Sequence, residues 1–139
     1  MRFSILPSLV ALAASPLALA QVYVVTDNSQ QFDNPSSSVD TLACAAFLQD
    51  YQTIGNIPGN LAGFSNVTSD KSLCDHCVTL GWQGREVVVW IVDTSPEEGF
   101  EVTEGAYEQL VGGPLLPGVY QAEIVSGPHS CVAPVPGSG

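Results

Sequence analysis

The sequence predicts a β-rich single domain with two short helices. Runs of β-branched and aromatic residues recur along the chain, and segments rich in Gly, Pro, Asn and Ser separate them, which is the pattern of short strands joined by turns. Only two stretches have the apolar spacing of a helix. Because crossover segments separate the strands, a closed barrel fits this order of elements better than a simple meander.

The first twenty residues have the layout of a secretory signal peptide. Arg2 supplies a positive start, an apolar run follows, and the stretch ends in an Ala-x-Ala cleavage pattern. A membrane helix is the alternative, but the apolar run is too short to cross a bilayer and prolines interrupt the stretch. We therefore expect residues 1–20 to be removed and residues 21–139 to form one secreted domain.

The N-terminal half of the domain predicts one strand and one helix. Residues 22–25 (VYVV) form a β-rich run that a polar, turn-rich segment follows. Residues 41–51 (TLACAAFLQDY) have helical spacing, and either Ser38 or Thr41 could be the N-cap. The irregular segment that follows contains an Asn-x-Thr sequon at Asn66, which predicts an N-glycosylation acceptor on a surface loop.

The strongest local signal is a β-hairpin. Residues 77–80 (CVTL) and 86–93 (EVVVWIVD) are β-branched runs, and the joining GWQGR contains Gly81 and Gly84, which suit a hairpin turn. The second run has no polar interruption before Asp93, which predicts a strand buried on both faces.

The C-terminal part predicts a helix and a last strand. Thr103 can cap a helix over residues 104–111, which Gly112 and the glycine after it would end. Residues 118–126 alternate apolar and polar side chains, as in a half-exposed strand. We expect the tail, about residues 133–139, to be disordered.

The charge of the chain excludes some partners. Its formal net charge is −11 at pH 7, and after the signal peptide its only Lys or Arg residues are Lys71 and Arg85. Nucleic acid and anionic membrane surfaces both require a positive face, so we expect neither as a partner. The acidity is typical of a protein that stays soluble outside the cell.

The four cysteines, an even number in a small secreted chain, predict a disulfide framework. A bond between Cys74 and Cys77 is the least favourable pairing, because redox couples of that spacing usually open a helix rather than precede a strand. The alternative is a zinc site with the ligands Cys74, Cys77, His129 and Cys131. An oxidising compartment argues against zinc, so we expect no metal and no cofactor, with both histidines at the surface.

Several short segments also form a combined pattern. FDNPSSSVDTLAC runs from a Phe-Asp-Asn start into the first cysteine, DYQTIGNIPG follows, and LCDHC, VWIVD and GFEV come next. In order and spacing they resemble the cerato-platanin family of small secreted fungal proteins, over nearly the whole of residues 21–139. The chain departs from the family pattern at Val78, where Trp is usual, and at Glu101, where Asn is usual.

The resemblance implies a fold and a disulfide pairing. The fold is a six-stranded double-psi β-barrel with short peripheral helices, related to the expansins and the barwin proteins. The implied disulfides are Cys44–Cys74 and Cys77–Cys131. Chain-entropy models assign roughly 3–4.5 kcal/mol to each of two loops of this size, which is substantial for so small and loop-rich a domain.

The resemblance also implies a function. Relatives bind short chitin oligomers in a shallow polar groove, and family members are commonly elicitors of plant defence or phytotoxic effectors. The carbohydrate-binding residues that it implies here are Asp33, Asn34, Ser38, Asp93 and Glu101. Trp82, in the predicted turn, or Tyr23 could add an aromatic face for the sugar, whereas Trp90 is expected in the core.

Two carboxylates leave an enzymatic alternative open. Expansins and the family-45 endoglucanases share this barrel and carry a carboxylate where Glu101 falls, and a glycosidase needs two carboxyl groups about 5–9.5 Å apart. Asp93 could be the acid, with Asp27 or Asp33 across the groove, although a purely structural role for Asp93 is equally open. The alternative function is an expansin-like wall-loosening protein or a weak polysaccharide hydrolase that uses Asp93 and Glu101.

The sequence thus predicts a non-enzymatic, monomeric protein that is secreted and stays extracellular or in the cell wall. Its expected partners are chitin or N-acetylglucosamine oligomers, or another wall polysaccharide, and a plant surface receptor. Glycosidase chemistry is the alternative.

Overall fold

The computed structural model describes residues 22–27, 29–113 and 120–131 of the chain. The predicted signal peptide (residues 1–20) and disordered tail (residues 133–139) lie outside the described residues. So do the side chains of Tyr23 and Asp27. Within the described part, no helix is long and apolar enough to span a membrane.

The described residues form a β-rich fold with short helices, as predicted. Six strands pair in the closed order β1-β5-β2-β4-β3-β6, so that each strand has two neighbours. The β1–β5 and β2–β4 pairs are parallel, and the other pairs are antiparallel. The strands are β1 (Val22–Asp27), β2 (Leu61–Phe64), β3 (His76–Trp82), β4 (Arg85–Asp93), β5 (Phe100–Val102) and β6 (Tyr120–Ser130). These pairings do not by themselves define a double-psi crossover, which stays a prediction.

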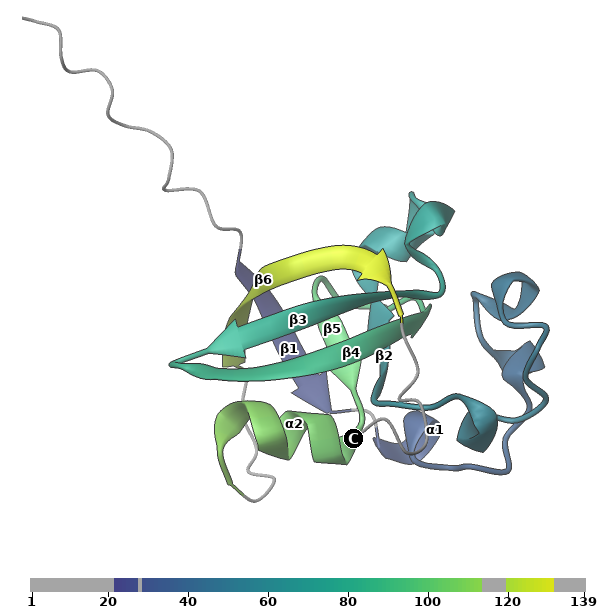
Figure 1. Cartoon of the computed structure of the whole chain (residues 1–139), viewed down its shortest axis with the longest axis horizontal. Coiled ribbons are helices and arrows are strands. Elements are labelled where there is room, and N and C mark those ends of the chain that lie inside the picture. The colour runs from purple at the N-terminus through teal and green to yellow at the C-terminus, as the bar shows by residue number, and fades with distance from the viewer. Residues whose placement is uncertain (1–21, 28, 114–119, 132–139) are drawn as a thin grey trace, which may run out of the picture.

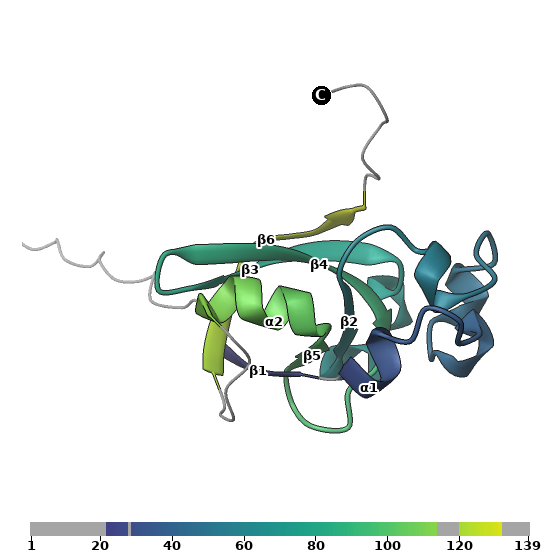
Figure 2. The same ribbon diagram turned by 90° about the horizontal axis from the view of Figure 1, so that it is seen from below.

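The long strands β3, β4 and β6 lie side by side, and helix α2 (Glu104–Val111) packs beneath them (Figures 1 and 2). Short helical turns gather beyond the end of β4, next to α1 (Ser29–Phe32) (Figure 1). These turns are η3 (Val39–Thr41), η4 (Ala45–Phe47) and η5 (Ile54–Asn56). The turns η6 (Ser65–Thr68) and η7 (Lys71–Leu73) lie above the start of β3, away from α1 (Figure 1).

The predicted helix over residues 41–51 is wrong. The structure has two separate 3-10 turns there, η3 and η4, and Leu42 between them is extended, with φ −94° and ψ 147°. The reason is that groups at the end of β4 form hydrogen bonds with the main chain of this segment. The N–H of Ala43 donates to the Asp93 carboxylate and the N–H of Cys44 donates to the carbonyl of Val92, so neither is free to bond within a helix. Ser38, one of the two predicted caps, does cap η3.

The predicted hairpin is confirmed, with a tighter turn than expected. Trp82 pairs directly with Arg85, and the two residues between them, Gln83 and Gly84, have φ of 48° and 82°. Positive φ at both central positions is the geometry that matches the twist of a two-residue hairpin. Trp82 is therefore the last residue of β3 and does not lie in the turn; its ring packs edge-on against Tyr120 with centroids 5.2 Å apart.

Helix α2 has the predicted bounds and caps. The Thr103 hydroxyl accepts the N–H of Ala106 at 3.3 Å, and Gly112 ends the helix in the left-handed conformation at φ 84°. One face of α2 joins the barrel core. The prediction that Trp90 packs in the core is also confirmed, because its side chain is 7% exposed and its Nε1 donates to Asp75 at 2.8 Å.

The two disulfides are Cys44–Cys74 and Cys77–Cys131, as the family resemblance implies. No cysteine is left free, so the zinc site and the Cys74–Cys77 redox pair are both wrong. Cys44–Cys74 joins the segment between η3 and η4 to the start of β3. It therefore anchors to the barrel the segment that contains Ala45 and Ala46, which line the groove described below.

Candidate carbohydrate-binding surface

Asp93 is the last residue of β4, and its carboxylate is directed at the protein's own main chain. One oxygen, Oδ1, accepts the N–H groups of Ala43 at 2.8 Å and Thr94 at 2.9 Å, and Oδ2 accepts Nε2 of Gln31 at 2.9 Å. The residue is 9% exposed. Asp93 thus connects α1 and the segment after η3 to the barrel, which is the structural role left open by the sequence.

Glu101 lies two strands away from Asp93, across a glycine. Gly63 on β2 is in register with Asp93 on one side and with Glu101 on the other. At the usual spacing of neighbouring strands, the Cα atoms of the two acids are therefore about 10 Å apart.

The surface over Gly63 is already covered. A Cβ on Gly63 would clash with the carbonyl oxygen of Thr94 and would lie 3.5 Å from the ring of Phe32. The main chain of Thr94 and the ring of Phe32 thus cover Gly63, the residue that lies between the two acids in the sheet.

The remaining predicted site residues support local structure. Asp33 Oδ2 accepts the N–H of Glu104, the first residue of α2, at 2.9 Å. Asn34 Oδ1 accepts the hydroxyl of Ser36 at 3.1 Å, and the Ser38 hydroxyl accepts the N–H of Asp40 at 3.0 Å. All three are exposed. The five predicted residues lie on several elements, and Ser38 and Asp33 line two different pockets.

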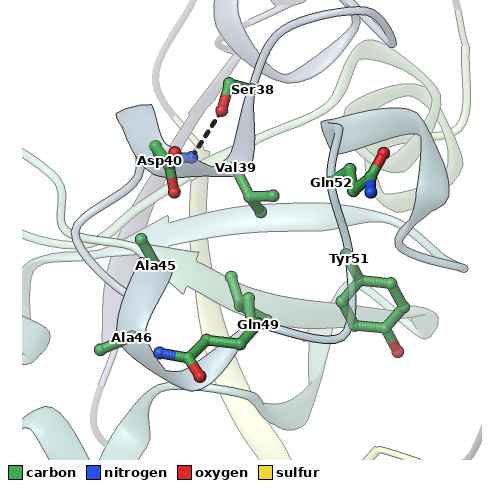
Figure 3. A pocket seen from close by; sticks show the side chains of 9 residues that line it. Ser38, Val39, Asp40, Ala45, Ala46, Gln49, Tyr51 and Gln52 are labelled. Carbon is green, nitrogen blue, oxygen red and sulfur yellow. Dashed lines mark hydrogen bonds between the residues drawn. The ribbon is translucent and has the colours of Figure 1, made fainter.

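One of them, Ser38, lines a groove that the sequence reasoning did not identify. This 38–52 groove has a volume of about 580 Å³. Its polar lining residues are Ser38, Asp40, Gln49, Tyr51 and Gln52. Figure 3 shows Ser38 and Asp40 on one side of the groove, Ala45, Ala46 and Gln49 on the other, and Tyr51 and Gln52 at one end.

The 38–52 groove was missed because five of its nine lining residues, from Ala45 to Tyr51, were assigned to a single helix over residues 41–51. A continuous helix over 41–51 would not fold back to form two facing walls. The signal that could have identified it is the run QDYQ at residues 49–52, which combines amides with an aromatic ring after an apolar stretch.

Backbone hydrogen bonds hold the walls of the groove together. Val39 N–H donates to the carbonyl of Gln52 at 3.1 Å, and Ser38 and Thr53 form an isolated β-bridge. The opposite wall follows Ala43 and Cys44, which are bonded to the end of β4. The groove is thus formed by the fold itself and does not depend on a ligand.

A second pocket, of about 350 Å³, lies beside the Cys77–Cys131 disulfide. Trp90, Val88 and His129 are among its lining residues. Asp33 lies on a smaller depression of about 260 Å³ near the start of α2. Neither of these two pockets includes Asp93 or Glu101.

Comparison with known proteins defines the class of fold. No protein-family model and no curated protein sequence matches this chain. Among solved structures, the crystal structure of cerato-platanin 3 from M. perniciosa superimposes with a TM-score of 0.60 and 24% identity, covering 67% of this chain and 82% of that one. The chain therefore has a cerato-platanin-like fold.

Two further structures agree. Cerato-platanin 5 from M. perniciosa gives a TM-score of 0.59 at 16% identity, covering 76% of this chain and 85% of that one. The solution structure of the fungal elicitor Cerato-Platanin gives 0.57 at 20% identity, covering 73% of this chain and 91% of that one. At these identities the likeness is one of fold.

Proposed function

We propose that this protein is a secreted, non-enzymatic, elicitor-type protein that binds chitin-like oligosaccharides outside the cell or in the cell wall. The observation that carries the proposal is the likeness of fold to three cerato-platanins, one of which is named a fungal elicitor. The two disulfides fit an oxidising, extracellular compartment. A plant surface receptor is the second partner that we propose.

The proposal includes a double-psi arrangement of the barrel strands and a signal peptide at the start of the chain. The parallel β1–β5 and β2–β4 pairs require crossover connections, which supports a double-psi barrel. Secretion would follow from the signal peptide over residues 1–20, whose layout supports it.

The absence of catalysis is supported by the geometry of the two acids. The Asp93 carboxylate accepts hydrogen bonds from three donors of the protein, and Thr94 and Phe32 cover Gly63, the sheet residue between Asp93 and Glu101. We therefore do not propose the hydrolase or the wall-loosening alternative.

Three measurements on the secreted protein test the proposal. Titration calorimetry with chitohexaose should show saturable binding, and the protein applied to plant leaf tissue should cause a burst of reactive oxygen. A reducing-end assay after prolonged incubation with chitin and β-glucan should stay at the level of the buffer. Lack of binding together with lack of a leaf response would contradict the proposed function, and release of reducing ends would contradict its non-enzymatic part.

A further inference from the structure

We propose that the 38–52 groove, rather than the surface around Asp93 and Glu101, is where a neutral oligosaccharide binds. This inference rests on the proposed function and gives that function a location. Gln49 and Gln52 would bind sugar hydroxyls, and Tyr51 would supply an aromatic surface.

The polar groups of the groove suit a neutral, hydroxyl-rich ligand. A primary amide offers both a donor and an acceptor, as a sugar hydroxyl does, and Gln49 and Gln52 are both exposed. The groove is lined by the carboxylate of Asp40 and by no Lys or Arg side chain. Because the whole chain also carries a formal net charge of −11, an anionic ligand would be repelled.

Tyr51 is held in a defined position beside these amides. Its side chain is half-buried, and its ring meets Trp90 edge-on, with centroids 6.3 Å apart and an interplanar angle of 87°. Trp90 is itself fixed through Nε1 to Asp75. A ring that is already immobilised costs little conformational entropy when it contacts a ligand, and the apolar C–H face of a sugar packs well on such a ring.

The size of the groove fits an oligosaccharide. Its volume of about 580 Å³ is within the usual range of about 300–1,000 Å³ for small-molecule sites. Opposite Ser38 and Asp40, the wall carries Ala45 and Ala46, whose small side chains leave the groove open (Figure 3). A larger side chain at the exposed Ala46 would fill this space without entering the core.

The test is a binding study on the whole secreted protein with two probes, chitohexaose and cellohexaose. The variants are Gln49→Ala, Gln52→Ala and Ala46→Phe, with Tyr51→Leu as a further variant. Each amide removal should weaken binding about 3–10-fold, which corresponds to the loss of one hydrogen bond, and Ala46→Phe should abolish binding. Gln30→Ala and Phe47→Ala are matched controls, because both residues are exposed and neither lines the groove.

The outcomes separate the inference from the proposed function. If the wild type binds and all groove variants match the controls, the groove is not the site, although the function stands. If the wild type binds neither probe, the inference is overturned together with the oligosaccharide-binding part of the proposed function, whereas the elicitor part is tested separately by the leaf response. Preference for chitohexaose identifies an acetamido sugar as the ligand, and equal binding identifies hydroxyl recognition alone, both of which support the inference when the groove variants lose affinity. Because Gln49 and Ala46 are exposed, the result does not depend on whether Tyr51→Leu folds.

Discussion

The carboxylate of Asp93 accepts a hydrogen bond from the backbone N–H of Ala43 at 2.8 Å, across 50 residues of sequence. This contact connects the end of a barrel strand to the loop that forms one wall of the 38–52 groove. It determines the local structure of that loop, because an N–H that donates to Asp93 is unavailable for a helix. The same contact makes Asp93 important for stability.

We expect Asp93→Ala to lower the free energy of unfolding by about 2–3 kcal/mol, because the N–H of Ala43 loses a charged acceptor in a half-buried position. Urea denaturation measures this loss. Hydrogen exchange should locate it, with the amide of Ala43 losing protection. An unchanged unfolding midpoint together with an unchanged exchange rate at Ala43 would show that the contact does not stabilise the loop.

Gly63→Ala should destabilise the protein by about 1–3 kcal/mol, since overpacking against a main-chain group cannot be relieved by a rotamer change. The new Cβ would meet the carbonyl oxygen of Thr94. Gly105→Ala is the matched control. Gly105 is exposed in α2 with nothing within 4 Å of a new Cβ, so this change should raise stability by about 0.5–1 kcal/mol through helix propensity. Thermal denaturation of both variants tests the contrast, and equal shifts would refute it.

Asp33→Ala should lower stability by about 0.5–1 kcal/mol, because its carboxylate accepts the N–H of Glu104 at the positive end of α2. The affinity for oligosaccharide should stay unchanged, since Asp33 does not line the 38–52 groove. Asp50→Ala removes an exposed carboxylate from a turn and serves as the control for loss of charge. If Asp33→Ala lost affinity for the oligosaccharide without losing stability, Asp33 would be a binding residue and this prediction would be wrong.

Asn66 should carry an N-linked glycan when the chain is secreted from a eukaryotic host. The residue is exposed on the η6 turn, and Thr68 completes the sequon. Mass spectrometry before and after enzymatic deglycosylation measures occupancy, and Asn66→Gln should remove the mass difference. Asn34→Gln should leave the mass difference in place, because Pro35 follows Asn34 and blocks that sequon.

Elements whose caps and turn residues lie within or next to the element itself could be predicted from the sequence. Helix α2 carries its own cap and its own terminating glycine, and the β3–β4 hairpin carries its own turn residues, so each was located close to its observed bounds. The short strands β2 and β5 were not predicted. With four and three residues, they are too short to show a periodicity, and they exist because neighbouring strands pair with them.

The candidate site was less predictable than the fold. Asp93 was correctly identified as a residue delivered by a buried strand, but its partners Gln31 and Ala43 lie 62 and 50 residues away. No local pattern shows that its oxygens are already bonded. The 38–52 groove was missed for the same reason. The hydrogen bonds that replace the predicted helix by two turns join Ala43 and Cys44 to the end of β4, which is far away in the sequence.

The sequence by itself determined the β-rich class, the hairpin, α2 and the presence of a disulfide framework, since each follows from the spacing of neighbouring residues. Only the tertiary structure decided that residues 41–51 form no helix, that Asp93 faces the protein, and that polar residues at 38–52 enclose a groove. The physical reason is that these features depend on hydrogen bonds and a disulfide between segments 30 to 62 residues apart. Such bonds override local preference where they satisfy groups that a helix would otherwise use.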